Sequence, residues 1–114
     1  EKAVATSVLA LGESHADVGH TYNNMAIVLR AQGKLPEAMA LYEKALAIRI
    51  RALGEEHADV GQTYNNMGSV LQAQGKLSEA MTLYEKALAV RLRALGEDHA
   101  DVGQTYNNMA FALQ

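Results

Sequence analysis

Apolar residues recur along 58–74 with the spacing of one helical face. They fall at i, i+4, i+7 and i+11: Val60, Tyr64, Met67 and Leu71. This spacing places them on one side of an α-helix. Gly75 follows, a residue suited to the left-handed position just past a helix end. The pattern predicts a first helix, called helix A, from about residue 58 to residue 74.

The stretch 77–95 is apolar on more than one side. Its main apolar residues step by three or four: Leu77, Met81, Tyr84, Leu88, Leu92 and Leu95. A second apolar strip lies beside them: Ala80, Ala87 and Ala94. A helix with so narrow a polar face packs against several neighbours. We therefore expect a second helix, helix B, antiparallel to helix A because only a short turn joins the two.

This two-helix pattern recurs along the whole chain with a fixed period. Residues 13–54 match residues 55–96 at 33 of 42 positions, 97–114 begin a further copy, and 1–12 align with the end of a copy. One helix pair cannot bury both apolar faces, whereas stacked pairs can. We expect an all-α solenoid of stacked antiparallel helix pairs, a single array over 1–114. The predicted helices are A at 15–32, 57–74 and 99–114, B at 35–53 and 77–95, and the end of a B helix at 1–11.

Small and polar residues predict how these helices begin and pack. Ser14 and Asp98 each precede an aspartate by three residues, the spacing of a capping box, so they are the expected N-caps. Glycine in the first turn costs roughly 1 kcal/mol against alanine. We expect the glycines of that turn to pack closely against the preceding B helix: Gly19, Gly61 and Gly103. Smaller residues later in helix A should admit the following B helix: Ala26, Gly68 and Ala110.

Composition and charge exclude several classes of function. The net charge is −3 with mixed signs, so a nucleic-acid-binding surface is not expected. No apolar run approaches the ~20 residues of a membrane span. The chain has no cysteine, which excludes disulfides and thiolate metal sites and is compatible with a reducing compartment; we expect a cytoplasmic protein. It also has no glycine-rich phosphate loop, so we expect neither a cofactor nor an enzyme.

The histidines His15, His57 and His99 lie one period apart. Stacked pairs are separated by about 10 Å, too far for the ~2 Å bonds of a shared metal. His57 and Asp59 could suggest a catalytic pair, but no serine or cysteine nucleophile recurs with them. A capping or loop role is therefore the expected one.

The recurring residues resemble those of the tetratricopeptide repeat family. The matching positions are Tyr64, Met67, Gly68, Leu71, Gly75, Glu79, Ala80, Tyr84, Ala87 and Leu88. The usual unit has ~34 residues, whereas this one is longer, with Leu92 in place of the usual proline. The longer unit, with LGxxHxDV before helix A and TxNNM within it, is similar to the repeats of kinesin light chains. Their usual proline after the histidine is alanine here: Ala16, Ala58 and Ala100.

The resemblance implies a scaffold that binds other proteins. Arrays of this family typically hold extended peptides along a concave surface lined by A helices, and asparagines at the place of the Asn pairs contact the peptide. The family is so widely reused that the match transfers no particular partner.

Differences between the two full copies point to the same surface. Positions 20, 27 and 30 differ from their counterparts and share one helical stripe with Asn23. We therefore expect a peptide-binding groove lined by His20, Asn23, Ile27, Arg30, Gln62, Asn65, Ser69, Gln72, Gln104, Asn107 and Phe111. The alternative is that exposed positions have drifted without a binding role.

Adjacent asparagines in mid-helix require a reason, because asparagine is a mediocre helix former. The amide of Asn65 could bind a peptide backbone, and that of Asn66 could bond to a neighbouring helix. Arg49 and Arg91 lie on the apolar side of helix B. They could pair with an aspartate of the next A helix or reach the groove.

The two ends predict self-association. Apolar residues of helix A near the C-terminus lack a partner B helix in the sequence: Tyr106, Met109 and Leu113. The N-terminal segment offers Val4, Val8 and Leu11. Head-to-tail contact between copies is the expected outcome. Two rival functions remain open at this point: a structural spacer or self-assembling rod without a groove ligand, and a regulatory array detached from a catalytic domain.

Overall fold

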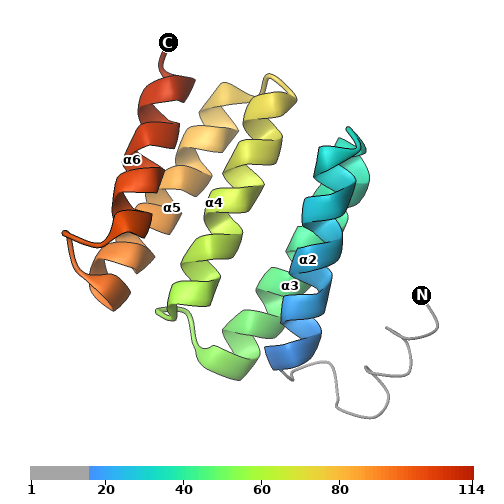
Figure 1. The fold of residues 1–114 in the computed structure, drawn as a ribbon, viewed down its shortest axis with the longest axis horizontal. Helices are drawn as coiled ribbons and strands as arrows, with labels where there is room; N and C mark the ends of the chain where they lie inside the picture. The colour runs from blue at the N-terminus through green and yellow to red at the C-terminus, as the bar shows by residue number, and fades with distance from the viewer. Residues whose placement is uncertain (1–15) are drawn as a thin grey trace. The chain divides into compact units, whose positions relative to one another are not determined.

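The computed structural model describes residues 16–114, and every regular element within them is an α-helix (Figure 1). The helices are α2 Ala16–Ala31, α3 Leu35–Leu53, α4 Ala58–Ala73, α5 Leu77–Leu95 and α6 Ala100–Ala112. Both B helices, α3 and α5, have the predicted bounds, and the A helices α2, α4 and α6 begin and end within two residues of theirs. The predicted end of a B helix at 1–11 lies outside the described residues.

The chain divides into two compact units, residues 1–55 and 56–114. In the described part of the first unit, α2 and α3 form an antiparallel pair. In the second unit, α5 packs against both α4 and α6 (Figure 1). The boundary falls within one residue of the start of the second full copy, so the second unit begins in the turn before α4. A single array over 1–114 stays a prediction.

Helix α4 ends as its sequence predicts. Gly75 has φ +79°, in the left-handed region that glycine adopts without a steric penalty. The N–H of Lys76 bonds to the carbonyl of Leu71 at 2.9 Å, and the N–H of Gly75 bonds to that of Gln72 at 3.0 Å. These two bonds satisfy carbonyls that a helix end leaves without partners. The chain can therefore reverse direction within a few residues and start α5.

The core of the second unit lies between α4 and α5. The buried apolar residues of these two helices are Val60, Met67, Val70, Leu71, Ala80, Tyr84, Ala87 and Val90. Gly68 permits the closest approach, because a Cβ at this position would lie 2.7 Å from the ring of Tyr84. This contact confirms the expected role of the small residue in helix A. The small residue at the same position of α2, Ala26, is also fully buried.

The glycines in the first turn of helix A do pack closely, but against a different helix from the one predicted. A Cβ on Gly61 would lie 3.0 Å from Cγ of Arg91 in α5, and one on Gly19 would lie 3.1 Å from Cγ of Arg49 in α3. In both cases the neighbour is the B helix that follows, so the expectation of a preceding helix is wrong. Gly103 has open space around it, since no helix of the described chain follows α6.

The N-cap of helix A is the histidine. Nδ1 of His57 accepts a hydrogen bond from the N–H of Asp59 at 3.0 Å, and His99 does the same for Asp101 at 3.0 Å. The ring nitrogen therefore satisfies an amide that the helix start leaves free. This confirms the capping role for these two histidines and corrects the capping box predicted at Asp98. Ser14 and His15 lie outside the described residues.

Candidate functional site

The predicted groove residues differ in how far they reach solvent. Seven are exposed: His20, Ile27, Arg30, Gln62, Gln104, Asn107 and Phe111. Two are half-buried: Ser69 and Gln72. The remaining two, Asn23 and Asn65, are only 2% and 4% exposed. The predicted stripe is thus accessible at most of its positions, but its first two asparagines do not belong to the accessible part.

Asn65 links two A helices of the second unit. Its Oδ1 accepts hydrogen bonds from Nδ2 of Asn108 at 3.1 Å and from Oγ1 of Thr105 at 3.3 Å, both in α6. The expected free amide at Asn65 is therefore wrong, because a buried side chain with two partners in α6 does not face solvent. We expected the second asparagine of a pair to bond to a neighbouring helix, and Asn108 makes such a bond.

Asn107, in contrast, keeps the accessibility expected of it. It holds the same position in α6 as Asn65 holds in α4, yet its side chain is exposed. Asn66 is half-buried and has an interaction partner of its own. The same asparagine position is therefore buried in α4, where α6 packs against it, and exposed in α6.

Sequence reasoning missed the role of Thr105. The same threonine recurs at Thr21 and Thr63, in the middle of each A helix. Its hydroxyl accepts from Nη1 of Arg91 at 2.9 Å and donates to Oδ1 of Asn65. The threonine recurs at the same position in every copy, although other residues form helices better. This recurrence could have indicated that its hydroxyl has a structural role.

Arg91 joins α5 to α6 and is only 3% exposed. Its Nη1 lies 2.9 Å from the carbonyl oxygen of Asp101 and 3.1 Å from Oε1 of Gln104, in addition to the bond to Thr105. Burial lowers the pKa of Arg91, and the Asp101 carboxylate opposes that shift. Of the two alternatives left open for this arginine, the bond to the next A helix is correct, although the partner in Asp101 is its backbone carbonyl.

Position 72 of the stripe takes part in packing. The hydroxyl of Tyr84 donates to Oε1 of Gln72 at 2.7 Å. In the first unit the same position is Arg30, and its tyrosine neighbour is Tyr42. Burial raises the pKa of Tyr42, and the charge of Arg30 partly opposes the shift. The replacement of Arg30 by Gln72 between the copies therefore changes the polar group next to a buried tyrosine, and it also changes one residue of the predicted groove.

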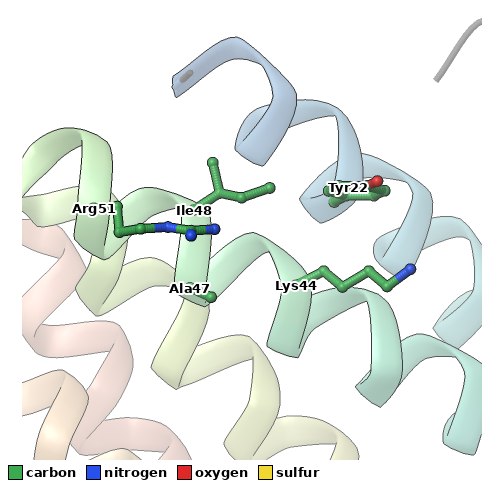
Figure 2. Close-up of a pocket in the computed structure, with 5 residues that line it drawn as sticks. All are labelled: Tyr22, Lys44, Ala47, Ile48 and Arg51. Atoms are coloured by element: carbon green, nitrogen blue, oxygen red, sulfur yellow. The ribbon is translucent and has the colours of Figure 1, made fainter. Parts of the chain in front are cut away.

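A pocket of about 200 Å³ lies between α2 and α3 in the first unit. Figure 2 shows its five side chains, with Tyr22 on α2 and the other four on α3: Lys44, Ala47, Ile48 and Arg51. Nζ of Lys44 lies 5.6 Å from the centre of the Tyr22 ring, within the range of a cation–π contact. One aromatic ring, two aliphatic side chains and two cationic side chains line the pocket.

Metal-ligand clusters and membrane-spanning helices are both absent from the described residues. No group of three or more histidine, cysteine, aspartate or glutamate side chains within residues 16–114 could hold a metal ion. None of the five helices in this range is long and apolar enough to span a membrane.

Comparisons with known proteins agree with the geometry. The model of the tetratricopeptide repeat matches residues 1–51, 17–93 and 59–114. The chain is similar to the crystal structure of BtubC (BKLC) from P. vanneervenii, with 29% identity and a TM-score of 0.85 over 93% of this chain and 42% of that chain. A search of curated proteins found no match.

Two structures of a putative kinesin light chain from P. anserina, with nearly identical TPR-like repeats, are also similar. One, of a single-substitution variant, has 25% identity and a TM-score of 0.78 over 97% of this chain and 52% of that chain. The other has 26% identity and a TM-score of 0.75 over 97% of this chain and 53% of that chain. The chain therefore spans about half, or less, of the length of these relatives. The likeness supports the predicted all-α repeat solenoid and the similarity to kinesin light chain repeats.

Proposed function

Because the chain belongs to the tetratricopeptide repeat family, we propose that it is a scaffold that holds extended peptide segments of other proteins against its A helices. Repeats of this family generally mediate protein–protein interaction and are typically non-catalytic. The proposal places the scaffold in the cytoplasm, a reducing compartment with which a chain without cysteine is compatible.

One position carries the proposal. Residues 27, 69 and 111 are equivalent in the three A helices, and they are isoleucine, serine and phenylalanine. Ile27 is 45% exposed and Phe111 is 66% exposed, while Ser69 is half-buried. A large apolar side chain in solvent contributes nothing to the core, and its identity changes from copy to copy in an otherwise constant frame. Variable exposed side chains on a fixed scaffold are what recognition of a specific peptide requires.

Polar residues beside this position could hold the peptide backbone. In the second unit, Gln62 and Gln104 are exposed at equivalent places on α4 and α6, and Asn107 is exposed one turn further along α6. The bond between Asn65 and Asn108 fixes the two helices against each other. Amide side chains provide both a donor and an acceptor, so they suit a peptide backbone of any sequence.

Selection of peptides from a random library on the full chain tests this proposal. In the selected complexes, Phe111→Ser and Ile27→Ser, which introduce the residue found at position 69, should each weaken binding by about 1–2 kcal/mol, about five- to thirtyfold. Leu77→Ser is the matched control, because Leu77 is 47% exposed on helix B. The Leu77→Ser variant should bind the selected peptides with unchanged affinity. Equal losses of affinity for all three variants would contradict the placement of the peptide site on the A helices.

A second candidate function is head-to-tail self-association, and exposed apolar residues on α6 and at its C-cap favour it. Tyr106 is 52% exposed and Leu113 is 73% exposed, whereas Leu71, the equivalent of Leu113 in α4, is 8% exposed against α5. A second copy could cover this surface. Thr21 and Asn24 are exposed on α2 and are equivalent to Thr105 and Asn108, so they could bond to the exposed Asn107 of another copy.

Light scattering over a concentration series tests self-association. We expect the average mass to rise with concentration, because a heterologous contact that does not close continues into filaments. Leu113→Glu should keep the chain monomeric, since it introduces a charge into an apolar contact. Phe111→Glu, on the opposite side of the same helix, should leave the rise in mass unchanged. A chain that stays monomeric at the highest soluble concentration would refute this candidate and leave the peptide scaffold untouched.

A further inference from the structure

A buried tyrosine of helix B has an acceptor for its hydroxyl in the second unit and none in the first. Tyr84 is 1% exposed, and its hydroxyl donates to Oε1 of Gln72 at 2.7 Å. The equivalent residues of the first unit are Tyr42, also 1% exposed, and Arg30. An arginine side chain has donors and no acceptor, so it cannot replace the glutamine carbonyl. Among the described residues, the hydroxyl of Tyr42 therefore has no hydrogen-bond partner.

This hydroxyl is nevertheless accessible from outside the protein. Within residues 16–114, the one side-chain nitrogen or oxygen that is both fully enclosed and without a partner is Nε of Arg91. The hydroxyl oxygen of Tyr42 lacks a partner and is not fully enclosed, so it reaches the surface while its ring stays buried. A ligand can therefore contact it without any change in the packing of α2 against α3.

Arg30 lies beside this hydroxyl. Burial raises the pKa of Tyr42, and the positive charge of Arg30 opposes that change, so the guanidinium is close enough to act on the phenol. Arg30 is exposed in the last turn of α2. The ion pairs of the described residues involve other side chains, so within this part of the chain its guanidinium has no carboxylate partner.

The chemistry of the two side chains defines the ligand that they fit. A guanidinium donates to both oxygens of a carboxylate, and such charge-assisted bonds are roughly twice as strong as neutral ones. The phenolic O–H adds a further donor, and the burial of its ring fixes its position. A neutral carbonyl would accept from the hydroxyl but would leave the positive charge unpaired. The pair of donors therefore favours a carboxylate.

We propose that Arg30 and the hydroxyl of Tyr42 bind the carboxylate of an aspartate or glutamate in the peptide that the scaffold holds. The inference rests on the proposed peptide function, because Arg30 shares the exposed stripe of α2 with Ile27. Ile27 lies three residues before Arg30 on the same face, so one peptide can contact both. In the second unit Gln72 already accepts from the tyrosine. The first unit therefore selects an acidic residue that the second unit does not.

NMR titration of the ¹⁵N-labelled full chain with two capped peptides tests the site. The probes are acetyl-Ala-Glu-Ala-amide and acetyl-Ala-Gln-Ala-amide. The Glu peptide should shift the amide signals of residues 27–31 and 39–45 in a saturable manner. The Gln peptide should bind at least about tenfold more weakly, because it loses the charge-assisted bonds. Equal binding of the two peptides, or no saturable shift in these two segments, would overturn the proposal.

Three variants locate the binding. Arg30→Gln gives the first unit the pair of the second, and it should weaken the Glu peptide at least about tenfold. Gln72→Arg makes the reverse change, and it should create a second site with saturable shifts at residues 69–73 and 81–87. Arg51→Gln is the matched control, since it removes the same charge from an exposed position of α3 outside the site. Equal losses for Arg30→Gln and Arg51→Gln would indicate attraction by net charge alone and would refute the site.

Two hydroxyl deletions provide a readout that a structural role would not give. Tyr42→Phe should weaken the Glu peptide about fivefold and leave the melting temperature unchanged, because this hydroxyl has no partner among the described residues. Tyr84→Phe should leave the Glu peptide unaffected and lower the melting temperature, because it loses the bond to Gln72. Equal melting temperatures with unchanged Glu-peptide affinity in both variants would contradict the part assigned to Tyr42.

The outcomes for this site and for the scaffold are distinguishable. If Arg30→Gln leaves the affinity for the Glu peptide unchanged, the carboxylate site is refuted, and the effects of Ile27→Ser and Phe111→Ser on selected peptides still decide the scaffold function. If library selection finds no peptide but the Glu peptide binds in an Arg30-dependent manner, the site stands and the scaffold function fails.

Discussion

Replacing Arg91 by alanine should lower the free energy of unfolding by about 3 kcal/mol. The change removes a buried side chain whose Nη1 has three partners in α6: the carbonyl of Asp101, Oε1 of Gln104 and Oγ1 of Thr105. It also removes aliphatic packing against Gly61, where the Cγ of Arg91 lies close. Both losses act on the contact between α5 and its neighbours, so urea unfolding followed by circular dichroism should detect them.

Arg93 provides the matched control on the same helix. Its Nε is 2.7 Å from Oε1 of Glu56, a shorter distance than any of the bonds of Arg91, but its side chain is 63% exposed. Exposed ion pairs contribute ~0–1 kcal/mol because water and salt screen them. Arg93→Ala should therefore cost less than about 1 kcal/mol. Equal losses for the two arginines would show that α5 and α6 do not depend on the buried guanidinium.

A methionine at position 91 separates the two parts of the effect. Methionine fills much of the volume of the arginine stem but offers no donor to α6. Arg91→Met should therefore recover the packing with Gly61 and retain the loss from the missing hydrogen bonds, about 1–2 kcal/mol. The Nε of Arg91 is buried with no hydrogen-bond partner among the described residues, so the polar contribution comes from the Nη1 end alone.

The helices could be predicted from the sequence because periodicity and turn residues act locally. Apolar spacing gives the faces of α4 and α5, and Gly75 ends helix A through its own backbone preference. The N-cap was harder, since any polar side chain near the helix start is a candidate. The structure selects His99 over Asp98 because the imidazole Nδ1, two residues before the amide of Asp101, reaches it at 3.0 Å.

The polar contacts could not be predicted in the same way because they join residues far apart in the sequence. Asn65 and Asn108 are separated by 43 positions, one more than the period of 42, so the two members of the Asn pair occupy opposite sides of one interface. Helical stripes describe one helix at a time and do not specify the distance or rotation of its neighbour. The same limit explains the wrong prediction for Gly61. A glycine in the first turn of helix A could contact either the preceding or the following B helix, and the sequence does not show that the close contact is with α5.

Asn65→Ala gives the second large expected effect, a loss of about 1–2 kcal/mol in the free energy of unfolding. The variant leaves Nδ2 of Asn108 without its acceptor and removes one partner of Thr105, in an interface where Asn65 itself is 4% exposed. The melting temperature should fall by roughly 4–8 °C for each kcal/mol. A residue that lined an open groove would instead affect peptide binding and leave the melting temperature unchanged.

Asn107→Ala tests the same residue type at the equivalent position of α6, where the side chain is exposed. Its effect on the free energy of unfolding should stay within about 0.5 kcal/mol. Hydrogen exchange adds a local readout, because Asn65→Ala should speed exchange of the amides in 100–112 more than those in 77–95, which remain packed on α4. The two alanine variants could instead melt at the same temperature and show equal exchange rates for the amides of α6. In that case the bond from Asn108 to Asn65 does not hold the A helices together. The stability of the second unit would then come from apolar packing and Arg91.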